Sequence, residues 1–391
     1  MNWDQCFAQR TALMRRSAIR ELMKATARED VISFAGGLPA AELFPIPRVK
    51  SALMAVLDEF NGQALQYSAT EGLPELRDWL ARRYSNRGIR VQRENVLITT
   101  GGQQALDLIG RILLDSGDRV IVENPTYLAL LSAWRPTGAE FLPVGCDADG
   151  MRVEELESLA RHKPKVIYCV PNFQNPQGTT LSLARRKQLV ELAQEQSVAI
   201  VEDDPYGELR YSGEALPNIA DYFNQVIHVG TFSKVLMPGL RVGWVIAPEA
   251  VIEKLTQAKQ SADLHTSTLN QHLALELAGK GFLETFLPVL RENYGERRNA
   301  MLNALAKYFP KSATWTRPEG GMFLLVTLPR HINTSELLPA ALEQGVAYVP
   351  GEEFHLNGEG KNTLRLSFAN ARRERIETGI KTLSRLMASH V

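Results

Sequence analysis

The pattern that most constrains the fold is a series of short apolar runs, rich in valine and isoleucine, between residues 95 and 247. The runs cover 95–99, 119–123, 140–144, 166–170, 198–201, 226–230 and 242–247. Segments with helical spacing separate them, as where Leu106, Ile109 and Leu113 lie three and four residues apart. Strands buried on both faces have this composition, so the pattern predicts an α/β fold whose central sheet is mainly parallel and flanked by helices.

The pattern changes at both ends of the chain. After residue 290 a long charged helical segment is followed by a mixture of short strands and helices, which predicts a smaller α+β domain. The first thirty residues look helical, and the segment 34–39 that follows is too rich in glycine and proline for a regular element. We therefore expect an N-terminal helical arm contributing to the small domain over 1–44, a large domain over 45–290 and a small C-terminal domain over 291–391.

The ends of the predicted strands carry the candidate chemistry, because ligands of open parallel sheets bind at the carboxyl ends of the strands. The turn Gly101-Gly102-Gln103 opens a helix, where free backbone N–H groups can bind an anion, although a plain tight turn has the same sequence. Tyr127 follows the next run, and its ring can stack on a flat cofactor or simply pack. Asn175 lies in a rigid loop as a directional amide, or as part of an Asx turn.

Two further strand ends carry charged residues. Asp203 lies in a row of three carboxylates, which is usually a solvated loop but gains a role when it meets a cationic ring nitrogen. Lys234 is flanked by hydroxyl residues and followed by Arg241. A partly buried lysine loses proton affinity and becomes an imine-forming nucleophile, whereas most lysines lie on the surface.

Each of these signals is weak alone, but together they describe one ligand. Five strand ends supply an anion cradle, a stacking ring, an amide, a carboxylate and a lysine–arginine pair. That set suits a flat, phosphorylated aldehyde with a cationic ring, which is pyridoxal 5′-phosphate. A carboxylate keeps the ring nitrogen protonated, so the ring accepts electrons from a substrate carbanion.

Composition excludes several other classes. The 44 basic and 44 acidic residues cancel (44 − 44 = 0) and the pI is near 7.1, which argues against nucleic acid or an anionic membrane as a partner. No apolar run approaches the ~18 residues of a spanning helix, and the start does not resemble a secretory signal. Three cysteines without a C-x-x-C pair, and seven histidines without a ligand pattern, predict neither disulfides nor a metal site. We expect a cytoplasmic protein.

Over essentially its whole length the chain resembles the fold-type I pyridoxal-phosphate-dependent aminotransferases. The resemblance rests on Ser233-Lys234 with the Pro-Gly-Leu-Arg-x-Gly motif at 238–243, on Asn175-Pro176-x-Gly178 and on Asp203-x-x-Tyr206. Segments 17–21, 34–39 and 65–72 are similar to the 2-aminoadipate/kynurenine aminotransferase group. That group includes the aminotransferase-like half of a class of bacterial regulators.

The resemblance implies a role for each matching residue. Lys234 would bind the cofactor aldehyde as an imine and shuttle the proton, and Asp203 would pair with the ring nitrogen. Arg365, together with Asn175, would hold the substrate α-carboxylate near Gly37, and Arg20 would reach an acidic substrate side chain. The remaining cofactor contacts would come from Gly101, Gly102, Gln103, Tyr127, Asn175, Tyr206, Thr231, Ser233, Arg241 and, across a dimer interface, Tyr67. Many relatives carry Ser or Ala where this chain has Gly102, and Ser where it has Thr231. Because Gly102 offers only its backbone N–H, one phosphate hydrogen bond is expected to be missing.

The leading hypothesis is an aminotransferase that moves an amino group from a 2-aminoadipate, aromatic or branched-chain donor to 2-oxoglutarate by a ping-pong mechanism. A pyridoxal-phosphate lyase or decarboxylase on the same scaffold is the alternative, because a fold does not fix the reaction. A cofactor-sensing regulator is a third possibility, which predicts a DNA-binding module before the aminotransferase part. Only about thirty residues precede segment 34–39, so we expect no such module. The resemblance also implies a homodimer.

Overall fold

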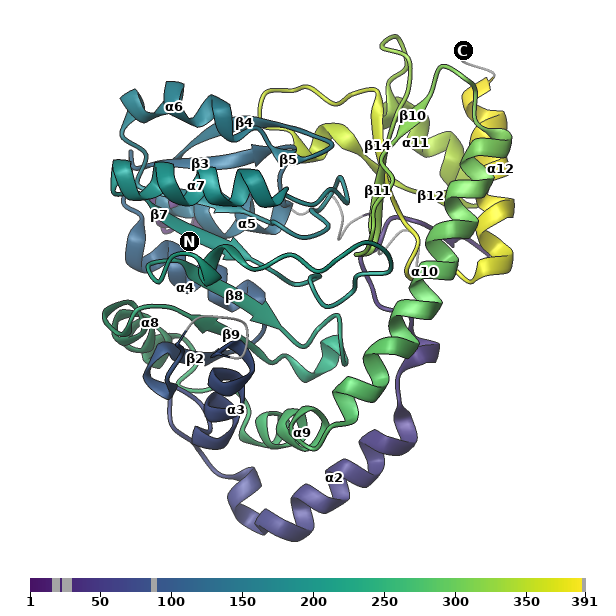
Figure 1. The fold of residues 1–391 in the computed structure, drawn as a ribbon. Coiled ribbons are helices and arrows are strands. Elements are labelled where there is room, and N and C mark those ends of the chain that lie inside the picture. Colours follow the sequence, from purple (N-terminus) through teal and green to yellow (C-terminus); the bar gives the residue numbers. More distant parts are fainter. Residues whose placement is uncertain (16–21, 23–29, 86–89, 389–391) are drawn as a thin grey trace.

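The computed structural model describes residues 1–15, 22, 30–85 and 90–388 (Figure 1). Its large sheet has the order β2-β9-β8-β7-β6-β3-β4-β5. These strands are β2 (Val96–Thr99), β3 (Arg119–Asn124), β4 (Glu140–Asp147), β5 (Gly150–Met151), β6 (Val166–Cys169), β7 (Ala199–Asp203), β8 (Ile227–Thr231) and β9 (Gly243–Ile246). The four central pairings, from β4 through β3, β6 and β7 to β8, are parallel. β9 is antiparallel to both β8 and β2. The predicted fold class is confirmed.

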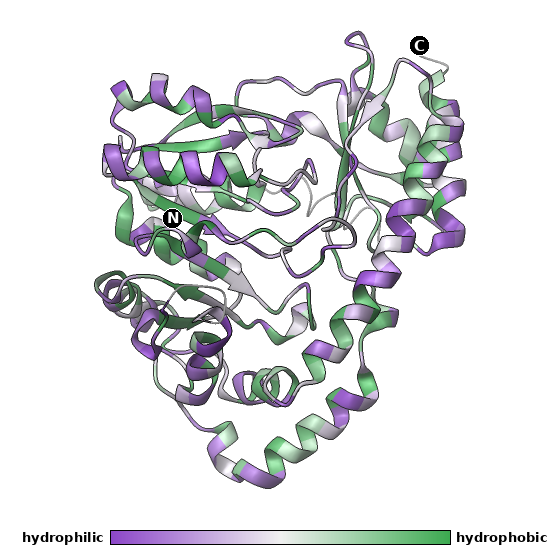
Figure 2. Cartoon of the chain, in the orientation of Figure 1, coloured by the Kyte–Doolittle hydropathy of each residue, from purple (hydrophilic) through white to green (hydrophobic). Residues whose placement is uncertain are grey.

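Helices cover both faces of this sheet because alternate strand residues point to opposite sides. Ile121, Ile167 and Ile200 face one way and pack in a cluster with α6 and α7. Their neighbours Val122 and Val166 face the other way, toward α4, α5 and α8. The helices concerned are α4 (Gly102–Leu113), α5 (Leu128–Trp134), α6 (Leu156–Leu159), α7 (Leu183–Gln196) and α8 (Glu249–Ala262). Figure 2 shows this as hydrophobic strands beneath helices that alternate between hydrophilic and hydrophobic sides.

The C-terminal part forms a second, smaller layer with its own core. Its antiparallel sheet has the order β10-β11-β14-β13. The strands are β10 (Thr314–Trp315), β11 (Phe323–Thr327), β13 (Val349–Pro350) and β14 (Thr363–Ser367), and the helices are α11 (Thr334–Glu343) and α12 (Arg373–Ala388). From the N-terminal region, β1 (Ile32–Ser33) pairs in parallel with β12 (Val346–Ala347), which ties the start of the chain to this part.

One long helix joins the two parts. α10 (Phe282–Tyr308) packs on both α9 (Thr268–Gly279) and α12. Its first half, with Leu283 and Leu290, belongs to the core of the large sheet, and its second half, with Met301 and Leu305, belongs to the small core. The predicted boundary at 290/291 falls inside this helix, and we keep the division as a proposal.

The remaining elements lie toward the N-terminus. α2 (Ile46–Phe60) and α3 (Pro74–Ser85) pack against α9. Residues 1–15 contain two short 3-10 turns, Trp3–Gln5 and Gln9–Leu13. Much of the helical segment expected in the first thirty residues, 16–21 and 23–29, lies outside the described residues. Within the described part of the chain, none of the helices combines the length and apolar character that crossing a bilayer requires.

Candidate active site

Most of the predicted site residues come from one edge of the large sheet, where the parallel strands end. β3, β6, β7 and β8 run in the same direction and lead into the segments with Tyr127, Asn175, Asp203 and Lys234. β9 runs the opposite way, so the segment before it, which carries Arg241, reaches the same edge. The antiparallel strand β9 therefore brings the cation of Arg241 to the same edge as the residues that follow the parallel strands.

The amine of Lys234 lies inside this edge rather than in solvent. Its Nζ donates a hydrogen bond to the backbone oxygen of Gly37, 3.0 Å away. Withdrawal from water, together with the positive charges of Arg241 and Arg365, lowers the pKa of Lys234 to about 8. No carboxylate pairs with it among the described residues. A substantial share of the amine is therefore neutral near neutral pH, which a nucleophilic lysine requires.

Asp203 is a buried carboxylate that forms no ion pair in the described part of the chain, although the charge of His228 favours its ionised form. It is 5 % exposed, and Oδ2 accepts a 2.7 Å hydrogen bond from the hydroxyl of Tyr168. Burial raises the pKa of Asp203 to about 7, and Asp204 adds to the rise, while the Tyr168 hydrogen bond opposes it. Because a buried charge is costly unless paired, this carboxylate suits a ligand that brings a positive charge to it.

Arg365, on β14, is a buried cation, whereas Asp203 is a buried carboxylate. Its guanidinium donates to Oδ1 of Asn175 at 2.8 Å and to the backbone oxygen of Ala35. It stacks over the ring of Phe323 at 4.2 Å. Nε is buried without a hydrogen-bond partner, and no described carboxylate pairs with the guanidinium. Burial lowers the pKa of Arg365 to about 10. A buried, half-satisfied guanidinium fits the carboxylate of a bound ligand.

Aromatic and amide groups lie between these charges. Burial raises the pKa of the Tyr206 hydroxyl, Tyr127 adds to the rise, and a hydrogen bond from Asn175 opposes it. Tyr206 also packs edge-on against Phe323, with ring centroids 6.0 Å apart. Tyr127 is half-buried and precedes α5. The structure thus brings Tyr127, Asn175 and Tyr206 into the neighbourhood of Asp203 and Arg365.

The residues predicted to hold an anion lie around the start of α4. Gly101 has φ +80°, and a Cβ there would lie 2.6 Å from a terminal nitrogen of Arg241, so glycine is required for this close approach. That same guanidinium donates to the backbone oxygen of Thr100 at 3.2 Å. Thr231 Oγ1 and Ser233 Oγ lie 2.9 Å apart at the end of β8. The Gln103 side chain instead donates to Ala129 O, which leaves its backbone N–H for a ligand.

The structure does not place Tyr67 with the other predicted site residues. Tyr67 is 78 % exposed, and its ring contacts His265 edge-on with centroids 5.6 Å apart. Arg20 lies outside the described residues. The role expected for Tyr67 involves a second subunit, so its exposure in one chain leaves that prediction open.

Sequence reasoning missed several buried polar groups around the site. Tyr168 reads as an ordinary strand residue, yet it holds Asp203. Glu123 is buried, burial raises its pKa to about 8, and it accepts hydrogen bonds from Val170 N and Gln174. Arg186 is fully buried and fixes the loop before Asn175 through the backbone oxygen of Pro171 and Oδ1 of Asn172. Only the unusual density of carboxylates at 202–204 could have signalled such a network.

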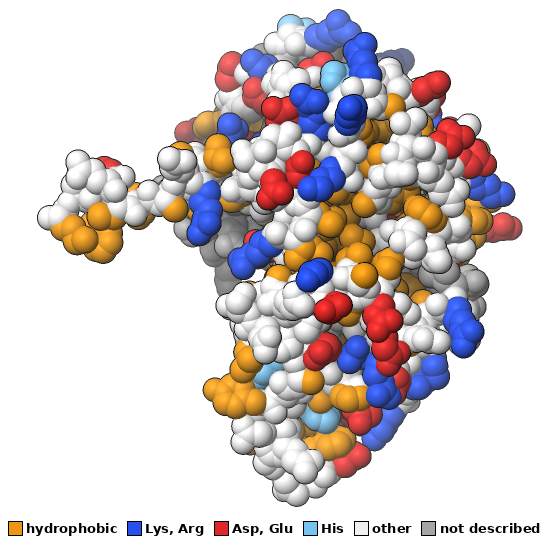
Figure 3. Space-filling model, turned by 90° about the vertical axis from the view of Figure 1, so that its left-hand side faces the viewer, with side chains coloured by type: hydrophobic (Ala, Val, Ile, Leu, Met, Phe, Trp, Pro, Cys, Tyr) orange, Lys and Arg blue, Asp and Glu red, His pale blue; other side chains and the backbone are white. Residues whose placement is uncertain are grey.

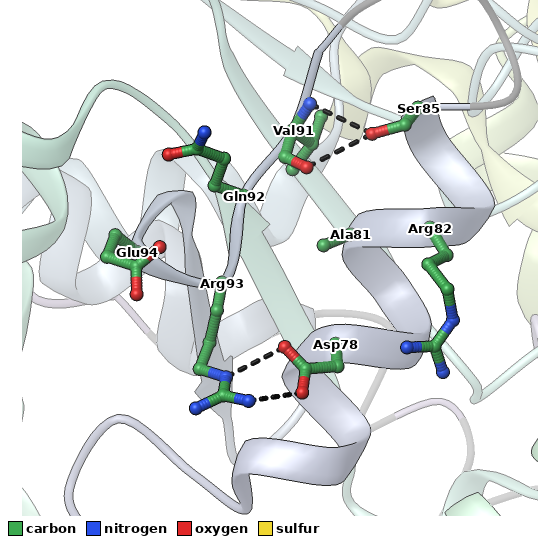
Figure 4. A pocket seen from close by; sticks show the side chains of 8 residues that line it. All are labelled: Asp78, Ala81, Arg82, Ser85, Val91, Gln92, Arg93 and Glu94. Atoms are coloured by element: carbon green, nitrogen blue, oxygen red, sulfur yellow. Dashed lines mark hydrogen bonds and ion pairs between the residues drawn. The ribbon is translucent and has the colours of Figure 1, made fainter.

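A hollow of about 540 Å³ lies elsewhere, between α3 and residues 91–94 (Figure 4). Its lining includes Asp78 and Arg93, which pair with each other through Nε and Nη2 of the arginine. None of the predicted site residues lines it. Since this ion pair lies at the surface, the hollow gives no reason to move the candidate site away from the strand ends.

Comparison with known proteins agrees with this geometry. The sequence profile of the aminotransferase class I and II family matches residues 29–383. Aromatic-amino-acid aminotransferase 1 of Thermococcus litoralis is 44% identical, over 98% of this chain and 94% of that protein. The structure of Pyrococcus horikoshii kynurenine aminotransferase, in complex with PMP, superposes with a TM-score of 0.96 at 42% identity, covering 100% and 98% of the two chains. The alpha-aminoadipate aminotransferase LysN from Thermus thermophilus gives 0.93 at 42% identity, covering 100% and 99%.

Fold, site and relatives together define the class: the protein is a pyridoxal 5′-phosphate-dependent transaminase, as the sequence predicts. More particularly, the chain belongs to the aminotransferase class I and II family. Its resemblance to the 2-aminoadipate/kynurenine aminotransferase group is confirmed as well.

Proposed function

We propose that this enzyme moves the amino group of an L-amino acid, from a 2-aminoadipate, aromatic or branched-chain set, to a 2-oxo acid such as 2-oxoglutarate in a ping-pong reaction. One observation carries the proposal: Arg365 is buried and without a carboxylate partner in the described chain, while it binds Asn175. An amino acid and a 2-oxo acid share the α-carboxylate that this guanidinium would hold. The names of the relatives support the donor set.

The charges of the site fit the cofactor. Bound pyridoxal phosphate supplies an aldehyde for the amine exchange and a ring that withdraws electrons from the substrate Cα. Lys234 would hold the aldehyde carbon and then carry the Cα proton, Asp203 would keep the ring nitrogen protonated, and Tyr127 would cover the ring. Asn175 and Tyr206 would donate to the ring oxygen. The phosphate would be held by Gly101, Gly102, Gln103, Thr231, Ser233 and Arg241.

The substrate end would be set by groups from both parts of the chain. Arg365 and Asn175 would fix the α-carboxylate, which orients the Cα–H bond for proton removal by Lys234. The backbone oxygen of Gly37 accepts a hydrogen bond from the amine of Lys234, so Gly37 would border the substrate. Arg20 would meet an acidic side chain of the substrate.

We propose further that the enzyme is a cytoplasmic homodimer without nucleic acid or membrane partners. The exposed residues Leu65, Tyr67 and Leu264 support an interface, because the Tyr67–His265 contact makes them neighbours in an apolar patch. Figure 3 shows a face on which basic and acidic side chains are interspersed, which suits neither nucleic acid nor an anionic membrane. The three free cysteines agree with a reducing compartment.

A single-turnover experiment tests the reaction. The full-length holoenzyme is mixed with one candidate donor and no acceptor, and cofactor absorbance and released 2-oxo acid are followed together. We expect one equivalent of 2-oxo acid, conversion of the cofactor to its amine form, and reversal by 2-oxoglutarate. Repeating this over the donor set gives the substrate range, and Lys234→Ala should bind cofactor without turning over. Ammonia release without conversion of the cofactor would instead indicate a lyase.

A further inference from the structure

Behind the anion cradle lies a charged cluster, built on a fully buried lysine, that the proposed mechanism does not use. Lys259, near the end of α8, has no exposed surface, and its Nζ donates to Asp263 Oδ1 at 2.7 Å and to Gln104 Oε1 at 2.9 Å. The other oxygen of Asp263 accepts from Gln104 Nε2 at 2.6 Å. Lysine is rarely buried completely without a reason, so the position of this cluster matters.

The cluster reaches the cradle through one residue. Thr100 Oγ1 donates to Asp263 Oδ2 at 2.7 Å and lies 3.2 Å from Thr266 Oγ1. Its backbone N–H donates to Gln104 Oε1 at 2.8 Å. On the opposite side, the guanidinium of Arg241 donates a hydrogen bond to the backbone oxygen of Thr100. Every polar group of Thr100 is therefore fixed, and Thr100 directly precedes Gly101 and Gly102.

We propose that Lys259 and Asp263 are positioning residues for the cofactor phosphate, acting through Thr100 and Gln104 on the first turn of α4. The inference rests on the proposed use of that turn as a phosphate cradle. The lysine and the carboxylate cancel in charge, so their effect is on geometry rather than on local potential. Free N–H groups bind an oxyanion well only when their directions are fixed in advance.

The ionisation of the cluster agrees with this arrangement. Partial burial alone would raise the pKa of Asp263 and is the largest single influence on it. The hydrogen bonds from Lys259, Gln104 and Thr100 together outweigh it and lower that pKa below its usual range. The carboxylate is thus held ionised in the form that can accept all of these donors.

The test compares two ligands that differ only in the phosphate. Full-length protein freed of cofactor is titrated with pyridoxal 5′-phosphate and with pyridoxal. We expect Asp263→Asn to weaken pyridoxal 5′-phosphate about tenfold, which is the scale of losing a charged hydrogen bond, and pyridoxal less than about twofold. Asp118→Asn is the matched control, because Asp118 accepts from Lys165 at the same 2.7 Å on another part of the surface. It should leave both affinities unchanged.

A second variant keeps the test decisive if Asp263→Asn folds poorly. Thr100→Val removes the hydroxyl that links the cluster to the cradle, and it should produce the same selective loss. Because both changes break one contact, the double variant should lose little more than either single one. An unchanged ratio of the two affinities in the single variants, or equal weakening of both ligands, overturns the inference. A parent protein that itself shows no preference for the phosphorylated ligand would instead refute the phosphate cradle and the proposed function.

Discussion

At the scale of single residues, the site is a set of charges left without partners. Asp203 and Arg365 are both buried, and neither has an ion-pair partner among the described residues. By contrast, the neighbouring buried carboxylate of Glu202 contacts His228 at 3.0 Å beneath the same edge. Because an unpaired buried charge destabilises the fold, the two groups are best explained by ligands that carry the opposite charges.

Lys234 gives the first prediction, because its pKa sets how fast it can capture the cofactor. Burial and two neighbouring cations disfavour the ammonium form and lower the pKa to about 8. At pH 7 roughly a tenth of the amine is then neutral, hundreds of times more than for an ordinary lysine. Stopped-flow absorbance should show the capture rate rising with pH up to about 8 and then levelling. The amine of Nα-acetyl-lysine should keep gaining rate toward its ordinary pKa. A rate for the protein that still climbs beyond pH 9.5 contradicts the lowered pKa.

Tyr168 and Asp203 give the second prediction, in which the Asp203 variant should lose more activity than the Tyr168 variant. If Asp203 faces the ring nitrogen as proposed, Asp203→Asn removes that charge and should lower kcat/KM more than about a hundredfold with the fold intact. Tyr168→Phe removes one hydrogen bond that favours the ionised carboxylate, so it should cost about tenfold. Tyr348→Phe, which loses a buried hydroxyl bonded to Thr334 O in the small domain, is the control and should keep full activity. Equal rates for the Tyr168 and Tyr348 variants would show that the first hydroxyl only supports packing.

At the scale of elements, the turn between β2 and α4 contains two adjacent glycines, and we expect a side chain to be tolerated at one of them but not at the other. Gly101→Ala would place a methyl group against Arg241 at a positive φ, so pyridoxal 5′-phosphate affinity should fall more than about tenfold. Gly102→Ala would meet only Val229 at 3.8 Å, an ordinary contact, and should change the affinity less than about threefold. Equilibrium titration of both variants checks this. A Gly102 variant as impaired as the Gly101 variant would mean that the cradle geometry is not the cause.

The elements also show what the sequence could and could not predict. Short apolar runs separated by helical spacing identify buried parallel strands, and residues at their ends must meet at one edge, so Lys234, Asp203 and Asn175 could be found in advance. The antiparallel direction of β9 has no such signal, since its run reads like the others. Tyr168, Arg186 and Lys259 could not be found either. Their roles depend on partners that only the tertiary fold brings within hydrogen-bond distance.

At the scale of the whole molecule, the site depends on contacts between the two parts of the chain. Arg365 comes from the small sheet and Asn175 from the large one, and they meet at 2.8 Å. The first half of α10 is packed in one core and the second half in the other, so a bend near its middle would change the Arg365–Asn175 distance. If Arg365 and Asn175 hold the substrate carboxylate as proposed, its binding and the relative position of the two parts are coupled by geometry.

The last prediction concerns assembly. If Tyr67 serves the site of a second chain, the protein should sediment at twice 43.5 kDa, about 87 kDa, and its specific activity should fall on dilution once the dimer dissociates. Leu65→Glu places a charge in the exposed apolar patch and should shift the mass toward that of one chain, with loss of activity. Met54→Glu, an equally exposed residue on α2, is the control for added surface charge. Analytical ultracentrifugation with parallel assays decides the matter. A fully active single chain would remove Tyr67 from the site, because its ring is exposed and packs against His265 within its own chain.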